Sequence, residues 1–130
     1  MHRELYRFGG MTLALESPDG VADSALCRPF RAEEGTADHT IALTFRDPLP
    51  QPPEDAAHWG VTYRWYTEAG RHTLQRYSAA GMAPQFTYAV TRGSRTEVTF
   101  ARRYRESLST QTVLEAASLF DILADAGMLV

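Results

Sequence analysis

Residues 86–102 decide the fold: they read Phe-Thr-Tyr-Ala-Val-Thr-Arg-Gly-Ser-Arg-Thr-Glu-Val-Thr-Phe-Ala-Arg. Large apolar side chains occupy alternate positions in both halves, at Phe86, Tyr88 and Val90 and then at Val98 and Phe100. This alternation is typical of strands that bury one face. Because Gly93-Ser94 suits a type II′ turn, the pattern predicts a hairpin of residues 86–92 and 95–102.

Shorter stretches of the same kind fill much of the chain before this hairpin. Strands are predicted at residues 5–8, 11–17, 40–45, 59–66 and 71–78, and a weaker candidate covers Cys27–Ala32. Gly9-Gly10 predicts a tight turn between the first two strands, and Gly70 predicts a hairpin between the last two. We therefore expect a mainly antiparallel sheet of six or seven strands, which is either open or curled.

After residue 108 the apolar period changes from two residues to three or four, which predicts one C-terminal helix. Its apolar stripe consists of Val113, Ala116, Ala117, Phe120, Leu123 and Ala124. Ser109, Thr110 and Thr112 are candidate N-caps, and Thr112 with Glu115 has the form of a capping box. Gly127 suits the residue that ends the helix. The predicted fold class is α+β, with residues 1–130 in a single domain and the helix on the apolar face of the sheet.

Four prolines and three acidic residues fall within residues 47–55, a composition that resists helix and sheet alike. The segment is interpreted as a surface loop within one domain. A linker between domains or a proline-rich ligand for a partner's aromatic groove would have the same composition. The segments on either side are too short to form two independent domains, which favours the loop.

All 13 basic residues are arginine, the acidic residues number 16, and the formal net charge is −3. Two explanations would account for the absence of lysine. One is codon bias, and the other is a selected preference for bidentate recognition by arginine. A chain without lysine has neither the lysine of a Walker-type phosphate loop nor an amine for Schiff-base chemistry. The acidic balance also makes nucleic acid an unexpected partner.

The single cysteine, Cys27, cannot form an internal disulfide, which fits a reducing compartment. No apolar run has the length of a membrane span, and none near the N-terminus resembles a signal peptide. We therefore expect a cytoplasmic protein that does not bind membranes.

The chain contains no nucleophile elbow, dinucleotide fingerprint or zinc-protease motif, and its four histidines are scattered. We expect no metal, no cofactor and no enzymatic activity. A cofactor-free enzyme remains an alternative, because an acid/base pair brought together by folding leaves no local motif.

One candidate binding face lies on the predicted hairpin of residues 59–78. Its main members are Arg64, Tyr66 and Arg76, and the nearby polar or aromatic residues are His58, Arg71, His72 and Tyr77. Guanidinium groups on one face could hold a phosphate or carboxylate in bidentate fashion. A solvated outer sheet face would show the same residues.

The candidate interface is the apolar end of the chain, formed by Phe120, Leu123, Met128, Leu129 and Val130. Its last three residues resemble the first half of a buried strand, and a short tail docked on the core is the alternative. Self-association through this end would make a homo-oligomer.

The chain resembles the region that precedes the nucleotide-binding core in bacterial HPr-kinase-like proteins. The residues that carry the resemblance are 5–13 (Leu-Tyr-Arg-Phe-Gly-Gly-Met-Thr-Leu), Gln75-Arg76-Tyr77, and 118–130 (Ser-Leu-Phe-Asp-Ile-Leu-Ala-Asp-Ala-Gly-Met-Leu-Val). The resemblance implies a non-catalytic accessory domain that recognises a peptide or protein substrate, or assembles with a kinase-like core. None of the family's catalytic residues has a counterpart here. It leaves open whether the chain is a truncated form or a stand-alone relative.

The competing hypothesis is a stand-alone domain that binds a small ligand. Six or seven strands would curl around a pocket, and the terminal helix would close one side. A defined small molecule would stabilise such a domain, whereas an accessory domain would respond to its partner protein.

Overall fold

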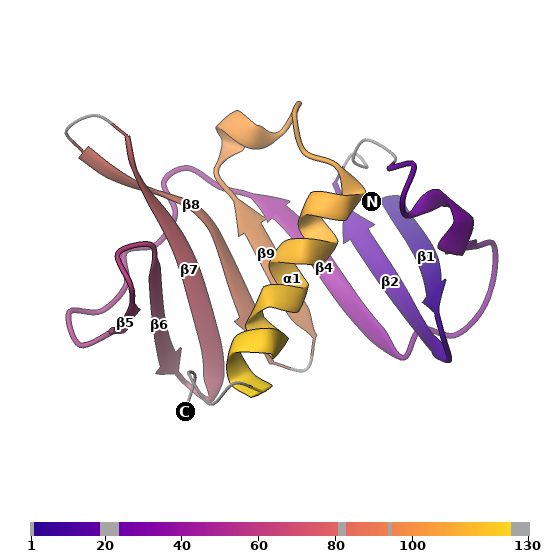
Figure 1. Cartoon of the computed structure of the whole chain (residues 1–130), viewed down its shortest axis with the longest axis horizontal. Coiled ribbons are helices and arrows are strands. Elements are labelled where there is room, and N and C mark those ends of the chain that lie inside the picture. The colour runs from indigo at the N-terminus through magenta and orange to yellow at the C-terminus, as the bar shows by residue number, and fades with distance from the viewer. Residues whose placement is uncertain (1, 19–23, 81–82, 94, 126–130) are drawn as a thin grey trace.

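The computed structural model describes residues 2–18, 24–80, 83–93 and 95–125. Within these ranges the chain forms one nine-stranded sheet crossed by one α-helix (Figure 1). The strands are β1 (His2–Phe8), β2 (Met11–Ser17), β3 (Arg31–Ala32), β4 (His39–Phe45), β5 (Ala57–Trp59), β6 (Tyr63–Glu68), β7 (Arg71–Ala80), β8 (Ala83–Arg92) and β9 (Thr96–Phe100). The helices are the 3₁₀ turns η1 (Arg28–Phe30) and η2 (Arg102–Tyr104) and the α-helix α1 (Thr110–Asp125).

The sheet has the strand order β3-β1-β2-β4-β9-β8-β7-β6-β5 and is mixed. β4 runs parallel to β2 on one side and to β9 on the other, while the remaining pairs are antiparallel. The expectation of six or seven antiparallel strands is therefore corrected in number and in direction. Parallel neighbours require long connections, and β4 has them on both sides: residues 18–38 before it and the whole β5–β8 meander after it.

Two local features account for the additional strands. Gly60, with φ of 61°, turns the chain between β5 and β6, so the predicted strand 59–66 is two antiparallel strands instead of one. The predicted strand Cys27–Ala32 is reduced to the two residues of β3, because Pro29 lies within the 3₁₀ turn η1. The predicted hairpins β1–β2, β6–β7 and β8–β9 are confirmed.

The hydrophobic core lies between the sheet and α1, which passes diagonally across the central strands in Figure 1 and contacts β8 and β9. On the sheet side, Leu43 and Val98 are opposite each other on β4 and β9, and both are buried. On the helix side, Val113, Ala116 and Ala117 are buried, and the two alanines allow a close approach to the sheet. We call this side of the sheet the helix face.

Ser109 caps the start of α1: its Oγ accepts a hydrogen bond from the backbone N–H of Thr112, at 3.4 Å. The helix therefore begins at Thr110, and the expected capping box of Thr112 with Glu115 is incorrect because both residues already lie inside the helix. Gly127, the predicted last residue, is outside the described residues.

The opposite side of the sheet, here called the open face, has small and polar side chains at its centre. Thr73 and Gln75 of β7 lie beside Ala89 and Thr91 of β8, followed by Thr99 of β9. Residues 46–56 form neither helix nor strand, as predicted for the proline-rich segment, and they approach this face at Pro50.

Candidate functional site

The predicted arginine-rich face is divided between the two sides of the sheet. Directly opposite residues in an antiparallel pair share a face, and the β6–β7 register pairs Arg64 with Gln75 but Arg76 with Tyr63. Arg64 and Tyr66 therefore lie on the open face, and Arg76 lies on the helix face. The prediction grouped the three residues on one face because the sequence does not show the register of the hairpin.

The neighbouring residues are divided in the same way. His58, Arg71 and Tyr77 share the open face with Arg64, whereas His72 shares the helix face with Arg76. The guanidinium of Arg64 lies over the ring of Tyr77, 4.8 Å from its centroid, and Arg64 Nη1 donates to the carbonyl oxygen of Tyr63 at 2.9 Å. Arg64 is thus engaged by the protein itself.

Arg76 lies on the opposite side, next to Tyr88 across the β7–β8 ladder, where its positive charge acts on the phenol. Burial raises the pKa of Tyr88, the neighbouring Tyr63 raises it further, and Arg76 lowers it in part. The net direction is upward, so this phenol stays protonated at neutral pH. Arg76 is exposed on the other side of the sheet and does not extend the predicted binding face.

The predicted apolar interface falls largely outside what the structure describes. Phe120 and Leu123 are part of α1, but their side chains are not among the described ones. Met128, Leu129 and Val130 lie beyond the described residues. The interface remains a prediction.

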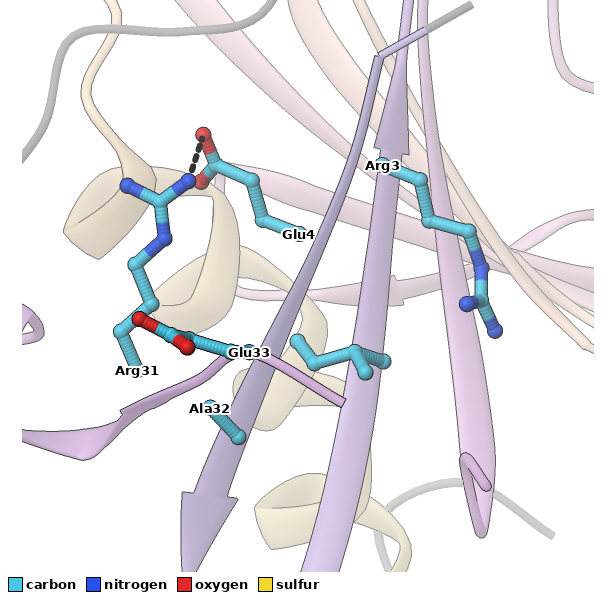
Figure 2. Close-up of a pocket in the computed structure, with 6 residues that line it drawn as sticks. Arg3, Glu4, Arg31, Ala32 and Glu33 are labelled. Atoms are coloured by element: carbon cyan, nitrogen blue, oxygen red, sulfur yellow. Dashed lines mark ion pairs between the residues drawn. The ribbon is translucent and has the colours of Figure 1, made fainter. Parts of the chain in front are cut away.

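A cavity of about 560 Å³ lies at the β1–β3 edge of the sheet, and two of its lining side chains, Glu4 and Arg31, form an ion pair (Figure 2). Arg31 reaches the carboxylate of Glu4 at 3.7 Å, and Figure 2 shows Arg3 pointing away from this pair. Tyr6 donates to Glu4 at 2.6 Å and His2 contacts it at 2.8 Å. Burial raises the pKa of Glu4, but these hydrogen bonds and the positive charges of Arg31 and His2 more than offset it, so the pKa lies below its usual value.

This edge cavity therefore holds a structural carboxylate whose partners are supplied by β1 and β3. Among its described lining residues, no buried polar side-chain atom lacks a hydrogen-bond partner that a ligand could supply. A different cavity contains such an atom.

We call this second cavity the open-face pocket; its volume is about 360 Å³. It is formed by the centre of the open face, by the loop of residues 46–56 and by the β6–β7 turn. Its lining residues are Arg46, Pro50, Tyr66, Glu68, Ala69, Arg71, Thr73, Gln75, Ala89, Thr91, Glu97 and Thr99. Ala89 lies directly between Gln75 and Thr99 in the strand register, and its short side chain leaves the space above it open.

Gln75 is the fully buried polar residue of this pocket. Its side-chain Nε2 donates to the carbonyl oxygen of Pro50 at 2.7 Å. Because a carbonyl oxygen only accepts, this bond fixes which way round the amide lies, and Oε1 is directed elsewhere. Oε1 is buried and accepts no hydrogen bond from any residue that the structure describes.

Hydroxyl groups surround this amide in two clusters. The hydroxyl oxygens of Thr73 and Thr91 are 3.0 Å apart, and Tyr66 lies opposite Thr73 in the β6–β7 register. Thr99 forms the second cluster with Thr44, also at 3.0 Å. Burial raises the pKa of Tyr66, and the charge of Glu68 adds to this, while the neighbouring hydroxyl of Thr73 lowers it in part. The net direction is upward, so the phenol keeps its proton at neutral pH.

The rim of the pocket carries charges that compensate one another. Arg71 donates to Glu97 at 2.5 Å, with about half of each side chain exposed to solvent. Arg46 and Glu68 add one further charge of each sign. Among the described residues, no cluster of histidine, cysteine or acidic side chains could hold a metal ion.

Sequence reasoning missed Gln75, Thr73 and Thr91 as site residues, because polar residues in an arginine-rich strand are typical of a solvated surface. One signal was available: Gln75 follows the apolar Leu74 in a predicted strand, and small residues such as Ala42 and Ala89 occur in other predicted strands. Sheet order, which the sequence does not show, brings these positions onto one face.

No helix in the described part of the chain is long and apolar enough to cross a lipid bilayer. Comparison with known proteins yields no match: no family model, no curated protein and no solved structure is similar to this chain.

Proposed function

We propose that this protein binds a small polar molecule in the open-face pocket. The observation that carries the proposal is Gln75, whose buried Oε1 has no hydrogen-bond donor among the described residues. A buried acceptor without a partner costs about 1–3 kcal/mol, and such groups are rare in folded proteins. Gln75 lines the pocket but is fully buried, so its side chain must turn toward the pocket before a bound molecule can donate to Oε1 and remove this cost.

The structure of the pocket supports the same proposal. Its floor consists of β7, β8 and β9, so its groups are held by strands in the middle of the sheet. The Gln75–Pro50 bond fixes one wall to the floor. Pockets for small molecules have volumes of about 300–1,000 Å³, and this one, at about 360 Å³, suits a molecule of roughly one ring.

A fragment screen by nuclear magnetic resonance tests the proposal on the full chain labelled with ¹⁵N. The fragments are small amides, ureas, alcohols, carboxylates and amines. We expect at least one to shift the backbone signals of Thr73, Gln75 and Thr91 in a saturable manner. Fragments that shift only signals remote from these strands would overturn the proposal.

Two variants sharpen the test. Gln75→Met removes the acceptor while keeping a long apolar side chain, and it should weaken the bound fragment by about threefold to tenfold. Thr40→Val is the matched control, because Thr40 lies on the open face next to Ala14, outside the pocket lining. Equal affinity of Gln75→Met and the unmodified protein would also contradict the proposal.

The accessory-domain function that the resemblance implies is the second candidate, and an apolar groove between the β1–β2 hairpin and α1 favours it. Met11 and Leu26 are exposed there, beside Leu13 and Leu114. An accessory domain would gain thermal stability from a kinase-like core or a protein substrate and from none of the fragments.

A further inference from the structure

We infer that the ligand of the open-face pocket is a neutral polyhydroxylated molecule, a sugar or a polyol. This inference rests on the proposed function and adds the chemical class of the ligand. It follows from the hydrogen-bond donors and acceptors that the pocket leaves unused and from the balance of its charges.

The first hydroxyl cluster has more protons than its internal hydrogen bond uses. Tyr66, Thr73 and Thr91 each carry one hydroxyl proton, and the contact between the two threonines uses one of the three. At least one proton is left to donate outward. Each hydroxyl oxygen can also accept, so the cluster offers a donor and acceptors at neighbouring positions.

The second cluster has the same property on a smaller scale. Thr44 and Thr99 have two protons and one mutual contact, which leaves one proton to donate. In the strand register Gln75, whose Oε1 can only accept, lies next to Thr73 on β7 and is separated from Thr99 by Ala89. The floor of the pocket therefore carries hydroxyl donors and an amide acceptor within one small area.

These groups distinguish between ligand classes. A carboxylate or phosphate oxygen only accepts and would leave Oε1 without a donor. An ammonium group only donates and would leave the spare hydroxyl protons unused. An alcohol both donates and accepts, and several alcohols on adjacent carbons do so at the spacing of neighbouring side chains.

The charges of the rim lead to the same class. Two arginines, Arg46 and Arg71, and two glutamates, Glu68 and Glu97, line the pocket, so the lining has no formal net charge. Arg71 and Glu97 neutralise each other directly. An ionic ligand would lose its hydration without meeting an excess of opposite charge, which is unfavourable, whereas a neutral ligand loses far less.

The test uses titrations of the ¹⁵N-labelled full chain with matched compounds. D-glucose, D-ribose and myo-inositol are the neutral probes, and tetrahydropyran is a ring of similar shape without hydroxyl groups. Acetate and methylammonium are the ionic probes. We expect at least one neutral probe to shift the signals of Thr73, Gln75 and Thr91 in a saturable manner, and no such shift with tetrahydropyran or the ionic probes.

Variants link the binding to the hydroxyl clusters. Thr73→Val and Thr91→Val keep the shape of the side chain and remove one hydroxyl, and each should raise the dissociation constant by about threefold to tenfold. Thr40→Val, on the same face outside the pocket, should change it by less than about twofold. Equal effects of all three variants would overturn the inference.

The outcomes separate this inference from the proposed function. If small amides or the ionic probes bind in a manner that depends on Gln75 and no neutral probe does, the ligand class is wrong and the pocket is still a binding site. If no compound shifts the pocket signals, both the proposed function and the inferred ligand class are wrong. Maltotriose beside D-glucose distinguishes a free sugar from a sugar at the end of a chain, and binding of either supports the class.

Discussion

The side-chain Nε2 of Gln75 donates to the carbonyl oxygen of Pro50 across 2.7 Å, and this contact joins the loop of residues 46–56 to the centre of the sheet. It also determines which atom of the amide remains unused. Both the wall of the open-face pocket and the acceptor on its floor therefore depend on one side chain.

Replacement of Gln75 should affect stability according to the chemistry of the new side chain. Gln75→Met loses one hydrogen bond but also removes the unpaired acceptor, so the free energy of unfolding should change by less than about 1 kcal/mol. Gln75→Glu puts a carboxylate beside the Pro50 carbonyl oxygen in a buried position and should cost at least about 2 kcal/mol. Urea denaturation measures both, and equal losses would contradict the role of the amide.

The turn between β6 and β7 should be improved by one substitution. Ala69 and Gly70 both have positive φ, 50° and 76°, which is typical of a type I′ turn. Alanine is strained in this region and asparagine tolerates it, so Ala69→Asn should stabilise the protein by about 0.5–1 kcal/mol. Thermal denaturation tests this, and a lower melting temperature would refute it.

The start of α1 can be located by a pair of alanine variants. Ser109→Ala removes the side chain that accepts from the Thr112 N–H and should cost about 1 kcal/mol. Thr112 lies inside the helix, so Thr112→Ala should lower the free energy of unfolding by at most a few tenths of that amount. If Thr112→Ala proved the more harmful variant in denaturation experiments, the helix would begin later than the structure shows.

His39 should make stability depend on pH. Burial and the positive charge of Arg92 lower the pKa of His39, whose ring nitrogen Nε2 lies 2.7 Å from the hydroxyl oxygen of Thr96. Between the folded and unfolded pKa values the unfolded chain binds more protons, so stability is present above pH 6.5 and decreases as the pH falls toward the folded value.

The corresponding measurement compares denaturation at pH 7.5 and pH 5.5. The protein should lose stability between these values, and His39→Gln should reduce that loss because glutamine does not titrate. A loss of the same size in His39→Gln would show that another group is responsible.

Local patterns predicted much of the fold. Alternating apolar residues and glycine turns were sufficient for β1–β2, β6–β7 and β8–β9, and a helical stripe was sufficient for α1. The pattern could not show that Gly60 turns the chain, because Val61 continues the apolar alternation of Tyr63 and Trp65. In the structure Val61 is exposed in the turn that Gly60 begins.

The candidate site was less accessible from the sequence, because it depends on strand order and register. Arg64 and Arg76 belong to opposite faces, a fact that only the pairing of β6 with β7 determines. Thr91 and Thr99 belong to the predicted hairpin, but Pro50 reaches Gln75 from a loop 25 residues earlier. Propensity and spacing contain no information about such contacts.

The two parallel ladders of β4 have a kinetic consequence. Each antiparallel hairpin joins neighbours in sequence and can form early, whereas β4 pairs with β9 across 55 residues, from Ile41 opposite Thr96 onward. The entropy of closing that long segment is lost before the ladder supplies compensating contacts, and such topologies fold slowly, in about milliseconds to seconds. The insertion of β4 between the preformed hairpins should therefore limit the rate of folding.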